Sequence, residues 1–278
     1  MKLILAGVPL GNPGDASTRL IEAIGSATII AAEDSRRFQR LCQDLGVKSG
    51  AKVLSFFEGN EEERTTLLIN ELKNGAVVLV VTDAGMPTVS DPGFKLVRAA
   101  IEENIPVEVL PGPSAVTTAL ALSGLPTDRF CFEGFVPRTK GARETFFENL
   151  KFENRTIVFF EAPHRLIETL EVAISVLGDT REAALCREMT KTYEETIRGS
   201  LSQIYSWAKS KEILGEITIV VNGAVEGAKE MSQQEIIDAV RNLESAGMDR
   251  KEAISAVAEA FALPKRAVFD AMVAAKNV

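Results

Sequence analysis

Residues 82–93 bring together the side chains best suited to chemistry, because two Asp, two Gly and two Pro fall within twelve positions. The segment follows an apolar β-branched run, so we place it at the carboxyl end of a predicted strand. Such a loop is stiff, exposes backbone amides and carries carboxylates that accept from amines or hydroxyls. We expect residues 83–85 to contact a ligand and Asp91 to be a helix N-cap.

Two other loops also follow predicted strands. In residues 7–15, Gly11 and Gly14 allow a ligand to approach the backbone closely, although a plain tight turn explains them equally well. Their spacing differs from G-x-G-x-x-G and no G-K-[ST] follows, which disfavours dinucleotide and triphosphate sites. In residues 110–115, small residues open the next helix and permit either ligand contact or close helix–sheet packing.

The composition describes a folded globular protein. The chain has 278 residues, a length that favours two domains. Because 46% of the residues are hydrophobic and 25% are charged, with a net charge of −8, we do not expect a disordered protein. Three scattered cysteines and one histidine disfavour a Cys/His metal site, and we expect no metal. No apolar run approaches the roughly 20 residues of a membrane helix, and no cleavage site follows residues 1–6, so we expect a cytoplasmic protein without membrane contact.

Strand and helix patterns alternate along most of the chain. Helical spacing at 18–26, 61–74, 142–150 and 166–177 separates short β-branched runs, which predicts an α/β fold with mostly parallel sheets and helices on both faces. Ligands then bind outside the carboxyl ends of the strands. The predicted strands are 3–7, 28–33, 52–57, 76–82 and 106–110, followed by 130–136, 156–161, 183–188 and 215–222.

The pattern predicts three regions: an α/β domain over 1–112, a second over 113–224 and a helical tail over 225–278. In the tail, Asp249 and Glu252 have capping-box spacing, and Pro264 fits the first turn of another helix. Ala258, Ala262 and Val268 suit a helix-turn-helix whose last helix carries Lys265 and Arg266. A small helical bundle packed on the body is the simpler interpretation.

Seven short motifs follow one another along the chain. They are the Gly11-Asn12 loop, AEDSRR at 32–37, DAG at 83–85 with SDPG at 90–93, PGPSA at 111–115, FEGFVP at 132–137, EAPHR at 161–165 and CREMTK at 186–191. Over nearly the whole chain, this series resembles the tetrapyrrole-methylase-like superfamily of S-adenosylmethionine-dependent methyltransferases. The runs at 32–37, 161–165 and 186–191 point to its branch that methylates a cytidine 2′-hydroxyl in small-subunit ribosomal RNA.

The resemblance implies that S-adenosyl-L-methionine lies in the cleft between two α/β domains, usually in a homodimer acting on RNA or the assembled small subunit. The residues carried over as cofactor contacts are Leu10, Asp83, Ala84, Gly85, Thr88, Val89, Ser114, Ala115, Glu161 and Met189.

Methylation of a ribose hydroxyl needs a proton acceptor or a nearby cation that favours the alkoxide. Strand ends offer Glu33, Asp34, Glu161, His164, Glu188 and Lys191. Of these, we favour Asp34 or Glu188 as the acceptor and Lys191 as a further catalytic group, whereas His164 is more simply structural.

Guanidinium groups pair bidentately with phosphate, so clustered arginines suggest RNA contacts. The residues expected to bind RNA are Arg36, Arg37, Arg165 and Arg187, with Arg138, Lys140 and Arg143 as a further basic stretch. For Arg36 and Arg37 a solvated helix face is the alternative.

Two other functions stay open: a methyltransferase for a small tetrapyrrole precursor, and a nonenzymatic RNA-binding module built on the tail. The clustered arginines count against the first, and the ligand-type loops at 83–85 and 114–115 count against the second.

Overall fold

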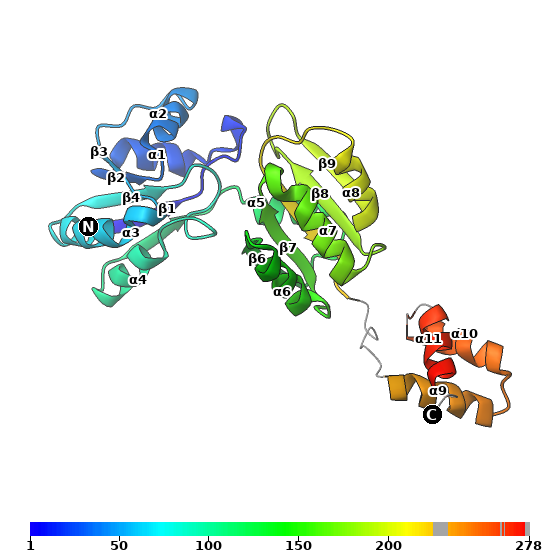
Figure 1. Cartoon of the computed structure of the whole chain (residues 1–278). Helices are drawn as coiled ribbons and strands as arrows, with labels where there is room; N and C mark the ends of the chain where they lie inside the picture. Colours follow the sequence, from blue (N-terminus) through cyan, green and yellow to red (C-terminus); the bar gives the residue numbers. More distant parts are fainter. Residues whose placement is uncertain (225–232, 262, 264, 276–278) are drawn as a thin grey trace.

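The structure is a computed structural model that describes residues 1–224, 233–261, 263 and 265–275. It contains two five-stranded sheets, each with helices on both faces, followed by a helical tail (Figure 1). No helix among the described residues is long and apolar enough to span a bilayer.

The first sheet is entirely parallel, with strand order β3-β2-β4-β1-β5. Its strands are β1 (Lys2–Ala6), β2 (Ile29–Ala32), β3 (Lys52–Ser55), β4 (Val77–Val81) and β5 (Val107–Leu110). Its helices are α1 (Thr18–Ser26), α2 (Ser35–Asp44), α3 (Glu61–Lys73) and α4 (Phe94–Glu102), with short 3-10 turns η1 (Pro13–Asp15) and η2 (Glu58–Asn60).

Alternation of side chains along β1 explains how helices cover both faces of this sheet. Leu3 and Leu5 pack with residues of α3 and α4, whereas Ile4 and Ala6 pack with residues of α1 and α2. Successive residues of a strand point to opposite faces, so a run of apolar residues requires cover on both. The predicted parallel α/β architecture is confirmed here.

The second sheet differs from the prediction because most of its strand pairs are antiparallel. Its order is β6-β7-β10-β8-β9; β6 and β7 are parallel, and the other three neighbouring pairs are antiparallel. The strands are β6 (Phe130–Phe135), β7 (Thr156–Glu161), β8 (Glu182–Arg187), β9 (Glu195–Ser200) and β10 (Ile217–Val221). Strand β9 was not predicted, because its sequence ETIRGS contains no apolar run. It lies at the edge of the sheet, where a strand can be largely polar.

Helices again cover both faces of the second sheet. One face packs against α5 (Ala115–Ser123), and the other against α6 (Lys140–Leu150), α7 (Leu166–Leu177) and α8 (Leu201–Lys209). A 3-10 turn, η3 (Pro163–Arg165), precedes α7. The predicted division at residue 112 falls between β5 and α5, and the division at 224 follows β10; these domain limits stay predictions.

The tail contains α9 (Gln233–Ser245), α10 (Arg250–Ala260) and α11 (Lys265–Ala274), which share one apolar core. Asp249 accepts a hydrogen bond from the amide of Lys251 at 3.0 Å and so caps α10. Ala258 and Val268 are buried, as a helix-turn-helix requires. Ala262 and Pro264 lie outside the described residues, so the helix-turn-helix stays a prediction.

Candidate active site

A cavity of about 390 Å³ lies between the two sheets, at the edge where the parallel strands end. Nine of the ten residues expected to contact the cofactor line it; the exception is Thr88. Those nine are Leu10, Asp83, Ala84, Gly85, Val89, Ser114, Ala115, Glu161 and Met189. Its size is within the usual range for a small-molecule site.

Close backbone contacts between loops shape one wall of this cavity. Val8 and Gly85 exchange two backbone hydrogen bonds of 2.9 and 3.1 Å, which join the loop after β1 to the loop after β4. A Cβ on Gly7 would lie 2.7 Å from the Cα of Gly112, so this contact with the loop after β5 requires glycine. Gly7 thus permits close packing between loops and does not itself line the cavity.

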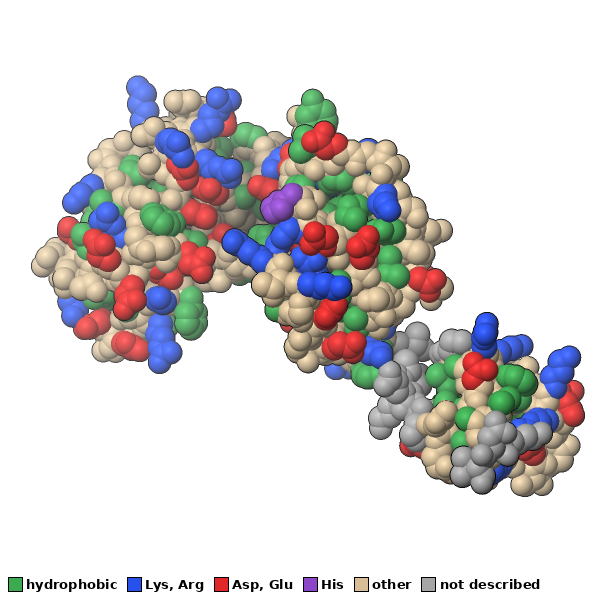
Figure 2. All heavy atoms as spheres, viewed as in Figure 1, with side chains coloured by type: hydrophobic (Ala, Val, Ile, Leu, Met, Phe, Trp, Pro, Cys, Tyr) green, Lys and Arg blue, Asp and Glu red, His purple; other side chains and the backbone are tan. Residues whose placement is uncertain are grey.

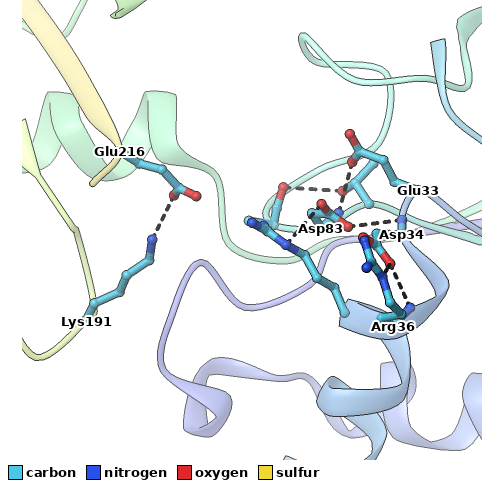
Figure 3. Close-up of polar contacts among 9 residues, drawn as sticks. Glu33, Asp34, Arg36, Asp83, Lys191 and Glu216 are labelled. Carbon is cyan, nitrogen blue, oxygen red and sulfur yellow. Dashed lines mark hydrogen bonds and ion pairs between the residues drawn. The ribbon is translucent and has the colours of Figure 1, made fainter. Parts of the chain in front are cut away.

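Asp83 joins the ends of β2 and β4. The amide of Asp83 donates to Glu33 Oε2 at 3.1 Å, and Asp83 Oδ1 accepts from the amide of Asp34 at 3.1 Å (Figure 3). Arg37 Nε lies 3.4 Å from the other oxygen of Asp83. Burial raises the pKa of both Glu33 and Asp83. These contacts hold the Asp83 carboxylate at the cavity wall.

Asp34, one of the two predicted proton acceptors, is engaged at the start of α2. It is the N-cap of α2 and accepts from the Arg36 amide at 2.8 Å, while Arg36 Nη2 lies 2.8 Å from its other oxygen. The Arg36 guanidinium lowers the Asp34 pKa to about 2. Asp34 does not line the cavity. A carboxylate this weakly basic is poorly suited to accept a proton at neutral pH.

Asp91 was expected to be a helix N-cap, and the structure corrects this. Helix α4 starts at Phe94, and the carboxylate of Glu61 from α3 accepts from the amides of Gly93 and Lys95 at 2.9 and 3.2 Å. Asp91 is therefore not needed for capping. It lies half-buried on the cavity wall, and burial raises its pKa to about 7.

The opposite wall comes from the second sheet. The β10 segment at 215–218 reaches the cavity because β10 runs antiparallel to β7 and β8, so its first residues lie beside the last residues of those strands. The mostly parallel sheet that we predicted would have placed this segment at the far edge. Further lining residues absent from the predicted site are Met86, Ser90, Val116, Phe135, Phe160, Ala162 and Pro163.

Glu188 and Lys191 lie beside the cavity but do not line it. Lys191 Nζ contacts Glu188 Oε1 at 2.9 Å and Glu216 Oε2 at 3.0 Å, the latter pair shown in Figure 3. The ion pair with Lys191 and a backbone hydrogen bond from Glu216 help to lower the Glu188 pKa, although partial burial opposes them. Glu188 is therefore also a weak candidate for the proton acceptor.

The loop of residues 188–191 also makes contacts between the two α/β halves of the protein. The amide of Asn12 donates to Thr190 Oγ1 at 3.1 Å. A Cβ on Gly11 would overlap the side chain of Lys191. Glu188 and Thr190 both have positive φ, at 52° and 66°, a strained backbone that occurs most often at functional sites. Residues 188–191 thus pack directly against the loop of residues 7–15.

The predicted RNA-binding arginines divide into two groups. Arg36 and Arg37 on α2 are exposed, and Figure 2 shows basic side chains gathered over this helix. Arg165 is turned inward: its guanidinium contacts Glu161 at 2.5 Å and donates to the Val136 carbonyl at 3.0 Å.

Two other predicted basic contacts, Arg187 and Arg143, are also engaged with groups of the protein itself. Arg187 donates to the Leu214 carbonyl at 3.1 Å and lies 3.3 Å from Glu195. Arg143 is 2% exposed and pairs with Glu168 at 3.1 Å, which argues against its predicted place on a basic surface. Arg138 and Lys140 remain exposed.

His164 is exposed on η3 and has no hydrogen-bond partner within the described part of the chain, so the expectation of a packed or hydrogen-bonded structural histidine is wrong. Glu161, three residues earlier, is buried and accepts hydrogen bonds from Thr169 Oγ1 and the Ala162 amide.

Among the described residues, no group of three His, Cys, Asp or Glu is arranged to hold a metal ion.

The cavity has the chemistry that S-adenosylmethionine requires. That molecule carries a positive sulfonium and an ammonium group, and the acidic residues Glu33, Asp83 and Glu216 line the cavity. Apolar residues such as Leu10, Val89 and Met189 provide surface for an adenine ring. The first turn of α5, at Ser114 and Ala115, adds backbone amides without a side-chain cap. Negative charge beside an apolar surface suits a cationic nucleoside.

Comparison with known proteins identifies the family of the chain. Residues 2–205 match the family described as Tetrapyrrole (Corrin/Porphyrin) Methylases. The chain is 47% identical over 277 residues to the ribosomal RNA small subunit methyltransferase I of Mycobacterium tuberculosis, covering 99% of this chain and 96% of the relative. The protein of the same name from Bacillus subtilis is 40% identical, with 97% and 93% covered.

Solved structures share the fold at low sequence identity. The methyltransferase CobJ superposes with a TM-score of 0.62 at 18% identity, covering 80% of this chain and 94% of CobJ. The uroporphyrin-III C-methyltransferase of Thermus thermophilus, in complex with S-adenosylhomocysteine, gives 0.54 at 18% identity, with 79% and 97% covered. The chain therefore belongs to the tetrapyrrole methylase family and, within it, to the ribosomal RNA small subunit methyltransferase I proteins.

Proposed function

We propose that this protein transfers a methyl group from S-adenosylmethionine to the 2′-hydroxyl of a cytidine ribose in small-subunit ribosomal RNA. The observation that carries the proposal is the cavity between the sheets, where nine predicted cofactor contacts meet. The names of relatives that match nearly the full chain support ribosomal RNA as the substrate class. We further propose that it works in the cytoplasm as a homodimer.

The cofactor supplies an activated methyl group, and the protein supplies position and charge. In the proposed site, Asp83 and its neighbour Glu33 face the cationic part of the cofactor, and Met189 and Leu10 enclose its apolar part. Orientation of two reactants in one site can by itself lower the barrier by about 7–11 kcal/mol. A mechanism without a covalent intermediate is therefore sufficient.

The RNA would enter over α2. Arg36 is 88% exposed and Arg37 is 61% exposed, and both follow directly from the strand end that carries Glu33. Phosphate contacts depend on where positive charge lies rather than on net charge, so a basic helix is compatible with a chain of net charge −8. Arg165 and Arg187, which are paired with acidic side chains of the protein itself, are not part of this proposed surface.

The proposal is tested by supplying labelled cofactor with assembled small subunits, naked ribosomal RNA and a porphyrinogen precursor in parallel. We expect label in the RNA, and nuclease digestion should place it on a cytidine ribose. Label only in the porphyrinogen would show instead that the protein is a tetrapyrrole-precursor methyltransferase. Asp83→Ala should weaken cofactor binding in calorimetry, and an unchanged affinity would refute the site assignment.

A further inference from the structure

The cavity contains a carboxylate that the proposed function has not yet used. Five acidic residues contribute to the wall, and the carboxylates of four of them are engaged in hydrogen bonds or ion pairs. Glu33 and Asp83 accept backbone amides, Glu161 pairs with Arg165, and Glu216 pairs with Lys191. Asp91 is the fifth, and within the described part of the chain no residue donates to it.

The local backbone explains how Asp91 is left free at this position. Thr88 and Ser90 have positive φ, at 75° and 62°, and Thr88 is β-branched, so the loop is held in a conformation that side chains usually avoid. Gly93, with φ of 129°, ends the loop, and Glu61 caps the helix that follows. The unusual backbone conformation of this loop thus places Asp91 on the cavity wall rather than at the start of α4.

We propose that Asp91 is the general base that accepts the proton from the ribose 2′-hydroxyl during methyl transfer. This inference rests on the proposed function. In the step, the hydroxyl oxygen forms a bond to the methyl carbon as the carbon–sulfur bond breaks and its electron pair stays on sulfur. The hydroxyl proton passes to an Asp91 oxygen and afterwards to water, so charge and atoms balance.

The charges around Asp91 suit a base that works near neutral pH. Burial first, and then the like charges of Glu33, Asp83 and Glu216, raise its pKa to about 7. Two cations pair with these neighbours, Arg37 with Asp83 and Lys191 with Glu216. A base is most effective when its pKa is close to the working pH, a condition that Asp34, with a pKa of about 2, does not meet.

The test compares Asp91→Asn, Asp91→Glu and wild type in single-turnover methyl transfer to small-subunit RNA and in cofactor binding by calorimetry. Loss of a general base typically costs about 10²- to 10⁴-fold in rate. We expect Asp91→Asn to slow transfer by about 100-fold or more while cofactor affinity changes less than about threefold. Asp91→Glu should recover part of the rate, since it keeps a carboxylate.

A pH profile separates a base from a structural role. The wild-type rate should rise with pH to a plateau as Asp91 loses its proton, and Asp91→Asn should lack this inflection. Because the cationic cofactor favours the carboxylate, the midpoint of the rate profile should lie below that of the cofactor-free protein. Carbon-13 NMR of the cofactor-free protein should show one Asp carboxyl with a midpoint of about 7, and the signal should be absent in Asp91→Asn. Glu102→Gln, which removes an exposed carboxylate paired with Arg98 on α4, is the matched control and should behave as wild type.

Two results would overturn the inference. One is transfer by Asp91→Asn at a rate close to wild type with the inflection intact. The other is a loss of cofactor affinity as large as the loss of rate, which would make Asp91 a cofactor ligand. Asp34→Asn, made in parallel, should keep the inflection. If wild type itself transfers no methyl group to RNA, the proposed function fails, whereas the NMR titration still reports on Asp91.

Discussion

Replacement of Arg165 by alanine distinguishes an internal ion pair from an RNA contact. The Arg165 side chain is 14% exposed, and the Glu161 carboxylate that it contacts at 2.5 Å is fully buried. Removing one partner of a buried pair leaves an uncompensated charge, which costs about 3–5 kcal/mol. The Ala162 amide and Thr169 hydroxyl still donate to Glu161, so we expect the lower end, about 3 kcal/mol.

For the two α/β halves together, residues 1–224, each kcal/mol lost from the free energy of unfolding lowers the melting temperature by about 2–4 °C. Arg165→Ala should therefore lower it by about 6–12 °C. Differential scanning calorimetry measures this shift. Adding Glu161→Gln to Arg165→Ala should recover part of it, because the buried charge is then gone. Arg36→Ala, at an exposed position, should shift the melting temperature by less than about 1 °C. An unchanged melting temperature for Arg165→Ala, together with weaker RNA binding, would refute this reasoning.

Three further predictions test other parts of the structure. Gly7→Ala should destabilise the protein by about 1–3 kcal/mol in a denaturant titration, because its Cβ would lie 2.7 Å from the Gly112 Cα; a neutral effect would contradict the close approach of these loops. Arg37→Gln should weaken RNA binding and reduce the slope of log affinity against log salt by about 1, and an unchanged slope would remove this residue from the RNA surface. The Asp34 carboxyl should titrate near 2 by NMR and move up towards 3.8 in Arg36→Ala, so any stability that it contributes is present above pH 4 and lost on acidification between these values.

Much of the first half could be predicted from local patterns. Apolar runs of strand length alternate with helical spacing, and parallel strands with crossover helices place their carboxyl ends at one edge. The loops after β1, β4 and β5 were each predicted to follow a strand, and the structure brings them together through the contacts of Gly7, Val8 and Gly85. The roles of these residues towards the cofactor remain proposals.

The second half needed the tertiary structure. The direction of β10 follows from its long-range pairing with β7 and β8, which no local pattern in residues 215–222 records. Arginine spacing in EAPHR and CREMTK is equally compatible with phosphate contacts and with the inward pairs that Arg165 and Arg187 make.

Local sequence therefore determined most of the strands, several of the helices and the glycine-rich turns, because backbone preferences and apolar periodicity act over a few residues. Only the folded chain decided how individual carboxylates are used. Asp91 has the sequence context of a helix cap, yet Glu61 from another helix caps α4 in its place. Competition between side chains distant in sequence for the same amide is settled by packing, and here it leaves Asp91 facing the cavity.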